Sequence, residues 1–369
     1  MTNQKIKLLI GITNFTAAGA QKLAADHLNH FDRARYELAL LTFFQEKDKD
    51  NFFHLLPGGI NNYKLDFKNC YDIKNWFRIF MVLKEYRPDV VISHLFFSNA
   101  VLRVFKPFFG YQIIIYEHNT YVNKTRLQIL ADKILSQFTL KIIADSEAIK
   151  DFTVKQEKIN PQKFVVIPCA VDYDKIQSQM IGYDQDALKQ KLGFGKDDKF
   201  VINVARLVKQ KNHKLLIESF AEFSQKNFGY KLIILGEGPL YDDLNNYIKD
   251  LNLAGKVFLL GPKRNVVEYL FISDLFVLTS KVEGFPIACL EALAVGLPVV
   301  SPNLSSFSNW LADGFNGYLA EGNSKEEIAR AMEKVVKSGP ASFSKNCRVT
   351  ARKYDIKNNI KEIEAIIPQ

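Results

Sequence analysis

The sequence is short of cysteine and has no long hydrophobic run. Its cysteines are Cys70, Cys169, Cys289 and Cys347; none forms a CxxC pair, and none joins histidines at the spacing of a zinc site. This pattern is typical of a protein of the reducing cytosol rather than of a disulfide-bonded secreted protein. No run of about 18 apolar residues is present, so we expect no membrane-spanning helix. The first residues also lack the apolar stretch and the cleavage site of a signal peptide.

Acidic residues are fewer than basic residues. Aspartate and glutamate number 40 against 49 lysines and arginines, which gives a net charge of +9 and a pI near 9.1. This balance favours an anionic partner, such as nucleotide phosphate, anionic lipid or nucleic acid, although a basic soluble protein without such a partner also shows it. The basic residues are scattered and no DNA- or RNA-binding motif appears, which disfavours nucleic acid. No GxGxxG follows a predicted strand, which disfavours a dehydrogenase.

The length and the hydrophobic pattern predict two α/β domains. A chain of 369 residues exceeds the usual size of one core. Short, continuously apolar runs alternate with amphipathic stretches such as 20–31, 125–138 and 213–227. Such runs are typical of strands buried on both faces of a parallel sheet. The predicted strands are 6–12, 36–44, 89–95, 112–118, 140–146 and 164–169, followed by 200–206, 230–238, 256–261, 274–280, 297–301 and 317–321.

The alternation breaks once, over the polar residues 172–199, which we interpret as a linker. The two series of strands therefore predict two doubly wound domains, 1–170 and 171–354, and we expect a C-terminal helix within 355–369 to pack back on the first domain. A capping box of Ser324 and Glu327 should start one of the last helices. Ligands of such domains bind at the carboxyl ends of the strands, so a cleft between two facing domains is the expected site.

The segment SKVEGFPIACLEALAVGLPVVS, residues 280–301, carries two carboxylates eight residues apart. Glu283 lies on the loop after a predicted strand, and Glu291 lies about one turn inside the helix that follows. The open amides near Ile287 and Ala288 make the start of this helix an anion site. A diphosphate there, flanked by carboxylates that accept sugar hydroxyls, would form a nucleotide-sugar pocket. Alternatively, the two acids are ordinary charges at the start of a solvated helix.

Two cations follow the predicted strand 200–206. Arg206 stands at its carboxyl end, and Lys211 lies in the polar loop before the next helix. Arginine offers phosphate a planar fork of donors and lysine offers a compact charge, so the pair suits a departing diphosphate. In a chain this basic, ordinary surface residues are the alternative explanation.

The order and spacing of ARLVKQKNHKLLIESF, LIILGEGPL, SKVEGFPIACLEALAVGLPVV and GFNGYL resemble those of a known family. The family is the retaining nucleotide-sugar glycosyltransferases of the GT-B fold, called family 4 or glycosyl transferases group 1, and the resemblance extends over essentially the whole chain. It implies two Rossmann-like domains that face each other across a cleft, the N-terminal one on the acceptor side and the C-terminal one binding the donor. It implies no cofactor and no metal, because the nucleotide sugar is a substrate and its leaving diphosphate is neutralised by cations and helix amides.

The resemblance also implies a role for each matching residue of the second domain. Arg206 and Lys211 would bind the diphosphate. Glu283 would bind the sugar hydroxyls near the reacting centre, and Glu291 would bind the ribose of the nucleotide. The remaining donor-binding residues, which would contact base, sugar and phosphate, are Gly236, Glu237, Phe285, Pro286, Ile287 and Ala288.

In the first domain the resemblance singles out His118, in IIIYEHNT, as a catalytic residue that lies against the transferred sugar and phosphate. A hydrogen-bonded loop histidine is the alternative. Glu117 and Asn119 flank it on the acceptor side. His94, at the end of the neighbouring strand, would contact acceptor or donor unless it is structural. Gly19 matches the glycine-rich loop that lets the backbone approach the phosphate.

The chain departs from the family pattern at three places. Residues 18–21 read Ala-Gly-Ala-Gln where two glycines, a small residue and glutamate are common, which bears on acceptor binding. IPCAVD at 167–172 lacks the usual Asn-Gly, and Asn309 stands where glutamate is usual; both bear on which sugar is transferred. The strings DYD (172–174) and DQD (184–186) imitate the metal motif of other glycosyltransferases, but we interpret them as polar linker.

The predicted reaction is the retaining transfer of a hexose or N-acetylhexosamine from a nucleoside diphosphate. UDP is the expected carrier and GDP-mannose the alternative donor. The acceptor would be a hydroxyl of a glycan or of a lipid-linked saccharide in surface polysaccharide synthesis. Two other functions stay open: a GT-B nucleotide-sugar 2-epimerase, and a non-catalytic sugar-nucleotide-binding partner of another transferase.

Aromatic and basic residues interleave in 75–87 and 94–111, with Arg78, Arg103 and Lys106 among the bases. That mixture suits a protein that rests on an anionic bilayer, and core aromatics with basic helix ends are the alternative. We therefore expect a cytoplasmic protein, with peripheral contact to the inner face of the cell membrane as a further hypothesis.

Overall fold

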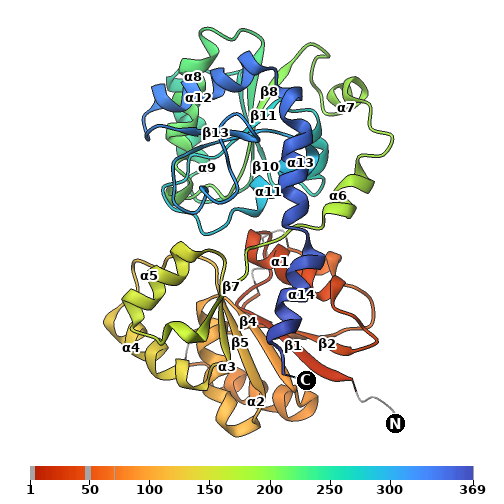
Figure 1. Cartoon of the computed structure of the whole chain (residues 1–369), viewed down its shortest axis with the longest axis vertical. Coiled ribbons are helices and arrows are strands. Elements are labelled where there is room, and N and C mark those ends of the chain that lie inside the picture. Colours follow the sequence, from red (N-terminus) through yellow and green to blue (C-terminus); the bar gives the residue numbers. More distant parts are fainter. Residues whose placement is uncertain (1–4, 46–50, 70, 369) are drawn as a thin grey trace. The chain divides into compact units, whose positions relative to one another are not determined.

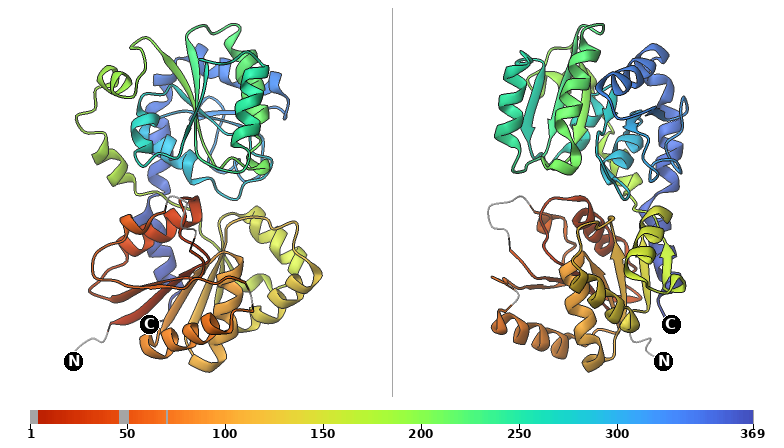
Figure 2. Two further views of the ribbon diagram at one scale, coloured as in Figure 1. Left: turned by 180° about the vertical axis from the view of Figure 1, so that it is seen from behind. Right: turned by 90° about the vertical axis from the view of Figure 1, so that its left-hand side faces the viewer.

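The computed structural model describes residues 5–45, 51–69 and 71–368. The chain divides into two compact units (Figure 1). The first is Met1–Ala170 together with Ile356–Gln369, and the second is Val171–Asp355. Each unit contains one parallel sheet with helices on both of its faces (Figure 2).

The first unit has a seven-stranded sheet with the order β3-β2-β1-β4-β5-β6-β7, in which all neighbouring strands are parallel. Its strands are β1 (Ile6–Ile12), β2 (Tyr36–Thr42), β3 (Asn61–Lys64), β4 (Val90–His94), β5 (Gln112–Glu117), β6 (Lys141–Ala144) and β7 (Phe164–Val166). Its helices are α1 (Gly19–His30), α2 (Ile73–Tyr86), α3 (Phe96–Phe109), α4 (Arg126–Leu135), α5 (Glu147–Glu157) and α14 (Ile356–Ile366).

Both faces of this sheet are buried, which explains the continuous apolar runs. Leu9 of β1 belongs to the core under α2, α3 and α5, while its neighbours Leu8 and Ile10 are equally buried and must point to the opposite face. α1 packs against α14, and α2 to α5 are successive neighbours. A strand covered on both sides has no polar face, so its sequence does not alternate.

The second unit has a six-stranded parallel sheet with the order β10-β9-β8-β11-β12-β13. Its strands are β8 (Lys199–Val204), β9 (Tyr230–Leu235), β10 (Val257–Gly261), β11 (Leu275–Val277), β12 (Val299–Pro302) and β13 (Gly317–Ala320). Its helices are α6 (Tyr173–Gln179), α7 (Gln185–Lys191), α8 (His213–Ser224), α9 (Tyr241–Asp250), α10 (Val266–Phe271), α11 (Ile287–Val295), α12 (Lys325–Ser338) and α13 (Ser344–Lys353).

The two parallel sheets confirm the predicted α/β class, with two local differences. β3 was not predicted, because it is a polar edge strand beside β2. Residues 172–199 are not a plain linker, since they form α6 and α7. Asp172 and Asp184 cap these two helices by accepting hydrogen bonds from the amides of Lys175 and Ala187.

Two further sequence features have clear structural counterparts. The capping box is present: Ser324 Oγ accepts from the Glu327 amide at 3.3 Å, and the Ser324 amide donates to Glu327 Oε2 at 3.1 Å. Cys169, Cys289 and Cys347 are buried free thiols, and Cys70 lies outside the described residues. In the described part of the chain, no helix is both long and apolar enough to cross a membrane.

Candidate active site

Each sheet reverses its strand order at one point, and ligands of open α/β sheets bind beyond the strand ends at such a point. In the first unit the reversal lies between β1 and β4, and in the second between β8 and β11. Gly19 follows β1, and His94 ends β4. Arg206 and Lys211 follow β8, and the loop after β11 carries Glu283. The fold therefore places these residues on the loops that such sheets use for ligands.

In the second unit the structure brings Lys211 and Glu283 together. Lys211 Nζ lies 2.5 Å from Glu283 Oε1, and the two side chains are 21% and 7% exposed. The backbone holds both loops in place: the Lys281 amide donates to Gln210 O at 2.9 Å, and Gln210 Nε2 donates to Val282 O at 2.8 Å. The largely buried Glu283 carboxylate thus accepts a hydrogen bond from the Lys211 ammonium group, which fixes its orientation.

Arg206 is close to Lys211 in the sequence, but it is not part of the hydrogen-bonded Lys211–Glu283 pair. Its side chain is exposed, and in the described part of the chain its guanidinium makes no hydrogen bond or ion pair. The loop after β9 packs against the loop that carries it, because the Leu207 amide donates to Glu237 O at 2.8 Å. Gly236 has φ +138°, and a Cβ there would lie 2.1 Å from Ala205 O, so only glycine fits. Glu237 is half-buried.

α11 begins beyond the carboxyl ends of the same strands, and the first amide groups of this helix are open. Its N-cap, Pro286, has no side-chain hydrogen bond to offer, so the amides of Ile287 and Ala288 have no side-chain cap. Gly296 ends the helix in the left-handed region at φ 102°. Glu291 is half-buried one turn inside. The positive end of the helix dipole therefore points out next to Glu283.

Phe285 and Ile287 do not present their side chains to solvent. Phe285 is 8% exposed, and its ring packs on Trp310 and Tyr354 with centroid separations of 5.7 and 5.0 Å. Ile287 is 7% exposed. Any contact that these residues make with a ligand would come from their backbone, while their side chains fix the start of α11 to the core.

In the first unit Gly19 is the exposed first residue of α1. The preceding Ala18 is extended and provides no side-chain cap. Gln21, the residue that departs from the family pattern, is 6% exposed and donates to Asn14 Oδ1 at 2.6 Å. Its neutral amide therefore ties α1 to the loop after β1.

His118 follows β5 and is held between two side chains from neighbouring strand ends. Its Nδ1 lies 2.8 Å from Asp145 Oδ2, just after β6, and its Nε2 lies 3.0 Å from His94 Nδ1 at the end of β4. The rings of His94, Tyr116 and His118 stack on one another at centroid distances of 4.6 to 5.2 Å. Burial lowers the pKa of His94 well below its ordinary value, so this histidine is neutral.

Cys169 joins this group from the segment after β7. The side-chain ligand atoms of His118, Asp145 and Cys169 lie within 4.8 Å of one another, close enough to hold a metal ion. However, a metal-binding cysteine must be a thiolate, whereas burial and then the charge of Asp145 raise the pKa of the Cys169 thiol well above its ordinary value. His118 Nδ1 is also already hydrogen-bonded to Asp145. We therefore interpret His118, Asp145 and Cys169 as a polar cluster whose members interact with one another, rather than as a metal centre.

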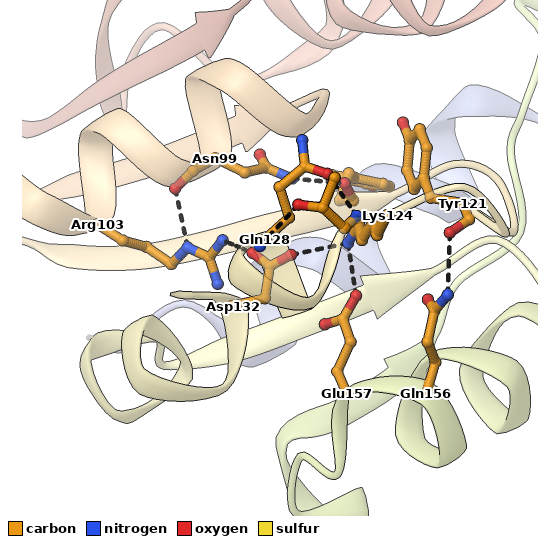
Figure 3. Close-up of polar contacts among 10 residues, drawn as sticks. Asn99, Arg103, Tyr121, Lys124, Gln128, Asp132, Gln156 and Glu157 are labelled. Atoms are coloured by element: carbon orange, nitrogen blue, oxygen red, sulfur yellow. Dashed lines mark hydrogen bonds and ion pairs between the residues drawn. The ribbon is translucent and has the colours of Figure 1, made fainter. Parts of the chain in front are cut away.

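Glu117 does not join this group: its pKa responds instead to the charges of a buried cluster, whose members are drawn in Figure 3. Lys124 lies between Asp132 Oδ2 at 2.9 Å and Glu157 Oε1 at 2.5 Å, and Arg103 pairs with Asp132 from α3. Glu117 is 4% exposed, and burial raises its pKa to about 7 although Lys124 opposes the shift. The cluster anchors the segment that follows His118, because Lys124 belongs to it.

The three residues expected on the acceptor side are all partly or fully buried. Glu117 is buried near the charge of Lys124, and His94 is fully buried and reaches His118 instead of solvent. Asn119 is half-buried and accepts a hydrogen bond from the Thr120 amide at 2.9 Å. In this structure none of the three offers a freely exposed side chain.

Asp145, Cys169 and Lys124 are the polar residues of this region that the sequence reasoning missed. Asp145 could have been found, because it directly follows a buried strand, as His118 does. Cys169 also follows a strand, but the chain around it gives no signal. Lys124 is part of a loop and is buried only because three acids surround it.

Comparison with known proteins identifies the family of this chain. Residues 17–175 match the family model "Glycosyltransferase Family 4", and residues 184–354 match "Glycosyl transferases group 1". A glycosyltransferase of Methanocaldococcus jannaschii is 30% identical over 292 residues, which are 74% of this chain and 70% of that protein. The Escherichia coli enzyme UDP-Gal:alpha-D-GlcNAc-diphosphoundecaprenol alpha-1,3-galactosyltransferase is 29% identical over 289 residues. These residues make up 75% of this chain and 74% of the Escherichia coli enzyme.

Among solved structures, Anabaena HepE in complex with UDP-glucose aligns with a TM-score of 0.83 at 18% identity, over 98% of this chain and 100% of that one. This likeness concerns the fold, which is the GT-B fold. The chain is therefore a glycosyltransferase of the GT-B fold and belongs to family 4, the glycosyl transferases group 1.

Proposed function

We propose that this glycosyltransferase moves a hexose or N-acetylhexosamine from UDP to a hydroxyl of a glycan or lipid-linked saccharide, with retention at the anomeric carbon. The observation that carries the proposal is the Lys211–Glu283 pair, set beside the open start of α11. The related enzyme of Escherichia coli is named for UDP-galactose and a diphosphoundecaprenol acceptor, and HepE was solved with UDP-glucose. Both names support a UDP donor, and the first supports a lipid-linked acceptor.

In the proposed reaction the diphosphate leaves toward positive charge that is already in place. Lys211, the exposed Arg206 and the amides of Ile287 and Ala288 would receive it, while Glu283 accepts hydroxyls of the sugar and Glu291 those of the ribose. The anomeric carbon–oxygen bond breaks, the acceptor oxygen bonds to the same face, and its proton passes to the diphosphate. Donors fixed beforehand need little reorganisation, which lowers the barrier.

The other donor contacts are proposed from the family resemblance. Gly236 and Glu237 would face the base, and Phe285 and Pro286 would shape the loop under the sugar. His118 and Gly19 would contact the sugar and phosphate from the first unit, with Asn119 and the buried Glu117 and His94 behind them on the acceptor side. We further propose that no metal or cofactor takes part, so transfer should persist in EDTA.

The test is to replace Lys211 or Glu283 by alanine and to measure transfer from UDP-sugars. Each change should lower kcat/KM roughly 100–1,000-fold, the usual cost of one such preorganised group. Lys209→Ala is the matched control, because Lys209 is exposed in the same 3₁₀ turn, Lys209–Lys211, and should transfer like the unchanged protein. Near-normal turnover of Lys211→Ala and Glu283→Ala would contradict the proposal. An epimer formed from the donor alone would indicate the epimerase instead, and donor binding without turnover the non-catalytic partner.

We also propose that the first unit rests on an anionic membrane through the neighbouring helices α2 and α3. Their exposed apolar side chains include Ile73, Phe77 and Phe108, which are 81%, 63% and 75% exposed. Exposed bases on α2 accompany them: Lys74, Arg78 and Lys84. Arg103 has to be removed from this set, because it is buried against Asp132. Apolar side chains with bases around them suit an anionic bilayer surface.

Co-sedimentation with liposomes of anionic lipid tests this contact. The double variant Phe77→Ser/Phe108→Ser should lose most of the binding. Phe228→Ser is the matched control, because Phe228 is 84% exposed on the second unit. Equal binding of all three proteins, or none by the unchanged protein, would refute the proposed surface.

A further inference from the structure

Strand ends of the first unit hold His118 by both of its nitrogens. Nδ1 is 2.8 Å from Asp145 Oδ2, and Nε2 is 3.0 Å from His94 Nδ1. The His118 side chain is 9% exposed and that of Asp145 is 1% exposed. Because both polar atoms of the ring are engaged within the protein, its carbon edge is what remains for a ligand.

The partners decide which nitrogen carries the proton. Asp145, as a carboxylate, only accepts hydrogen bonds, so His118 donates from Nδ1. Its Nε2 then accepts from the Nδ1–H of His94, which is neutral because burial lowers its pKa. In the described part of the chain His94 Nε2 has no hydrogen-bond partner. A buried, unprotonated nitrogen without a partner costs less free energy than a buried N–H group without an acceptor would.

We propose that Asp145 is the positioning residue of His118, whose ring it fixes in the Nδ1–H tautomer and in one orientation. This inference deepens the proposed function and rests on it, because there the His118 ring lies against the donor sugar and phosphate. Neither nitrogen is then free to take the acceptor's proton. His118 acts through its shape and its fixed dipole, and the proton goes to the departing diphosphate.

Cys169 does not alter the hydrogen bond between His118 and Asp145. Its sulfur lies within 4.8 Å of a ring nitrogen of His118 and of a carboxylate oxygen of Asp145. Burial and the charge of Asp145 raise the pKa of the thiol and keep it protonated, so it is a weak donor toward the carboxylate and does not compete for the His118 proton. The carboxylate therefore has no stronger partner in this group than His118.

The hydrogen bond can be tested by ¹⁵N NMR of protein labelled at histidine. The chain has six histidines, and His118→Asn identifies the His118 signals by their disappearance. The unchanged protein should show a protonated Nδ1 and a bare Nε2 at His118. Asp145→Asn, whose amide can donate to Nδ1, and Asp145→Leu, which bonds to neither nitrogen, should both move the proton to Nε2.

Kinetics then separate positioning from mere support of the fold. Both Asp145 variants should lower kcat roughly 10–100-fold, by analogy with the cost of losing a carboxylate that orients a metal-ligating histidine. KM for the nucleotide sugar should change little, because most of the proposed donor-binding residues, Arg206, Lys211 and Glu291 among them, belong to the second unit. Asp26→Asn is the matched control: Asp26 is 3% exposed in the same unit but pairs with Lys22, so kcat and the His118 signals should stay unchanged.

Several results would overturn the proposal. One is a bare Nδ1 at His118 in the unchanged protein. Another is an unaltered tautomer in both Asp145 variants, and a third is an altered tautomer with normal kcat, which would reduce Asp145 to a structural residue. If the unchanged protein transfers no sugar from any nucleotide sugar, the proposed function fails, and the NMR spectra still decide whether Asp145 fixes the ring.

Discussion

Burial strongly alters the acidity of Glu117. Its pKa rises from the ordinary 4.5 to about 7, chiefly because burial disfavours the charged form. Between these two pH values the folded protein keeps a proton that the unfolded chain has released. The contribution of Glu117 to stability is therefore most favourable below pH 4.5 and declines as the pH rises through 7.

Glu117→Gln should remove this decline, because a glutamine of the same shape has no proton to lose. Relative to the unchanged protein, the variant should gain about 2–3 kcal/mol in unfolding free energy between pH 5 and pH 8. Urea unfolding at both pH values measures the difference. Glu85→Gln, at an exposed position on α2, is the control and should show no such gain. A constant offset of Glu117→Gln at the two pH values would contradict the assignment.

The sequence locates strand-end residues well but does not show which way each one points. His118, Arg206 and Lys211 do follow strands, as their positions after apolar runs indicated. Glu117 precedes His118 by one residue and so points to the opposite side, into charges contributed by other helices. Phe285 reads as a loop residue but packs on Trp310, which comes from a segment 25 residues later. Such orientations depend on tertiary partners that a single segment does not encode.

At the scale of elements, apolar strands and capped helices were predictable, and polar elements were not. Each of the twelve predicted strands overlaps a strand of the two sheets, because burial on both faces leaves an unambiguous apolar run. β3 is an edge strand whose residues are mostly exposed, so its sequence carries no such signal. α6 and α7 are short and polar, and their N-caps, Asp172 and Asp184, were the only clue.

The loop after β9 gives a prediction for an element rather than for a side chain. Gly236→Ala should displace this loop, because the new Cβ would meet Ala205 O at 2.1 Å and the backbone would stay at an unfavourable φ of +138°. We expect the KM for the nucleotide sugar to rise at least about tenfold, which corresponds to about 1.4 kcal/mol of lost binding. The loop that carries Arg206 would have to shift with it.

The control for this change is Gly229→Ala. Gly229 also has a positive φ, +87°, but a Cβ added there would meet nothing within 4 Å, so only backbone strain of about 1–3 kcal/mol is expected. Thermal unfolding and initial-rate kinetics of both variants separate strain from displacement. Equal KM values for the two variants would show that the close approach at Gly236 has no bearing on the donor.

At the scale of the whole molecule, the first unit is completed by the far end of the chain. α14 packs against α1, and Asn359 on α14 donates from Nδ2 to Pro168 O at 2.7 Å. Its Oδ1 lies 2.8 Å from Nε2 of the buried His27. Burial lowers the pKa of His27 to about 3, so the ring is neutral and can donate this hydrogen bond. One amide thus joins residues 332 and 191 positions away in the sequence.

Asn359→Leu should therefore destabilise the first unit and leave the second as it is. The change deprives two buried groups, Pro168 O and His27 Nε2, of their partner, at a cost of about 1–3 kcal/mol each. Hydrogen exchange should accelerate in peptides of α1 and α14, while peptides of β8 to β13 keep their protection because their core contains neither helix. Asn358→Leu is the matched control, one position earlier on the exposed side of α14. If both leucine variants exchange alike, or if protection is lost equally in both units, α14 does not stabilise the first unit through Asn359.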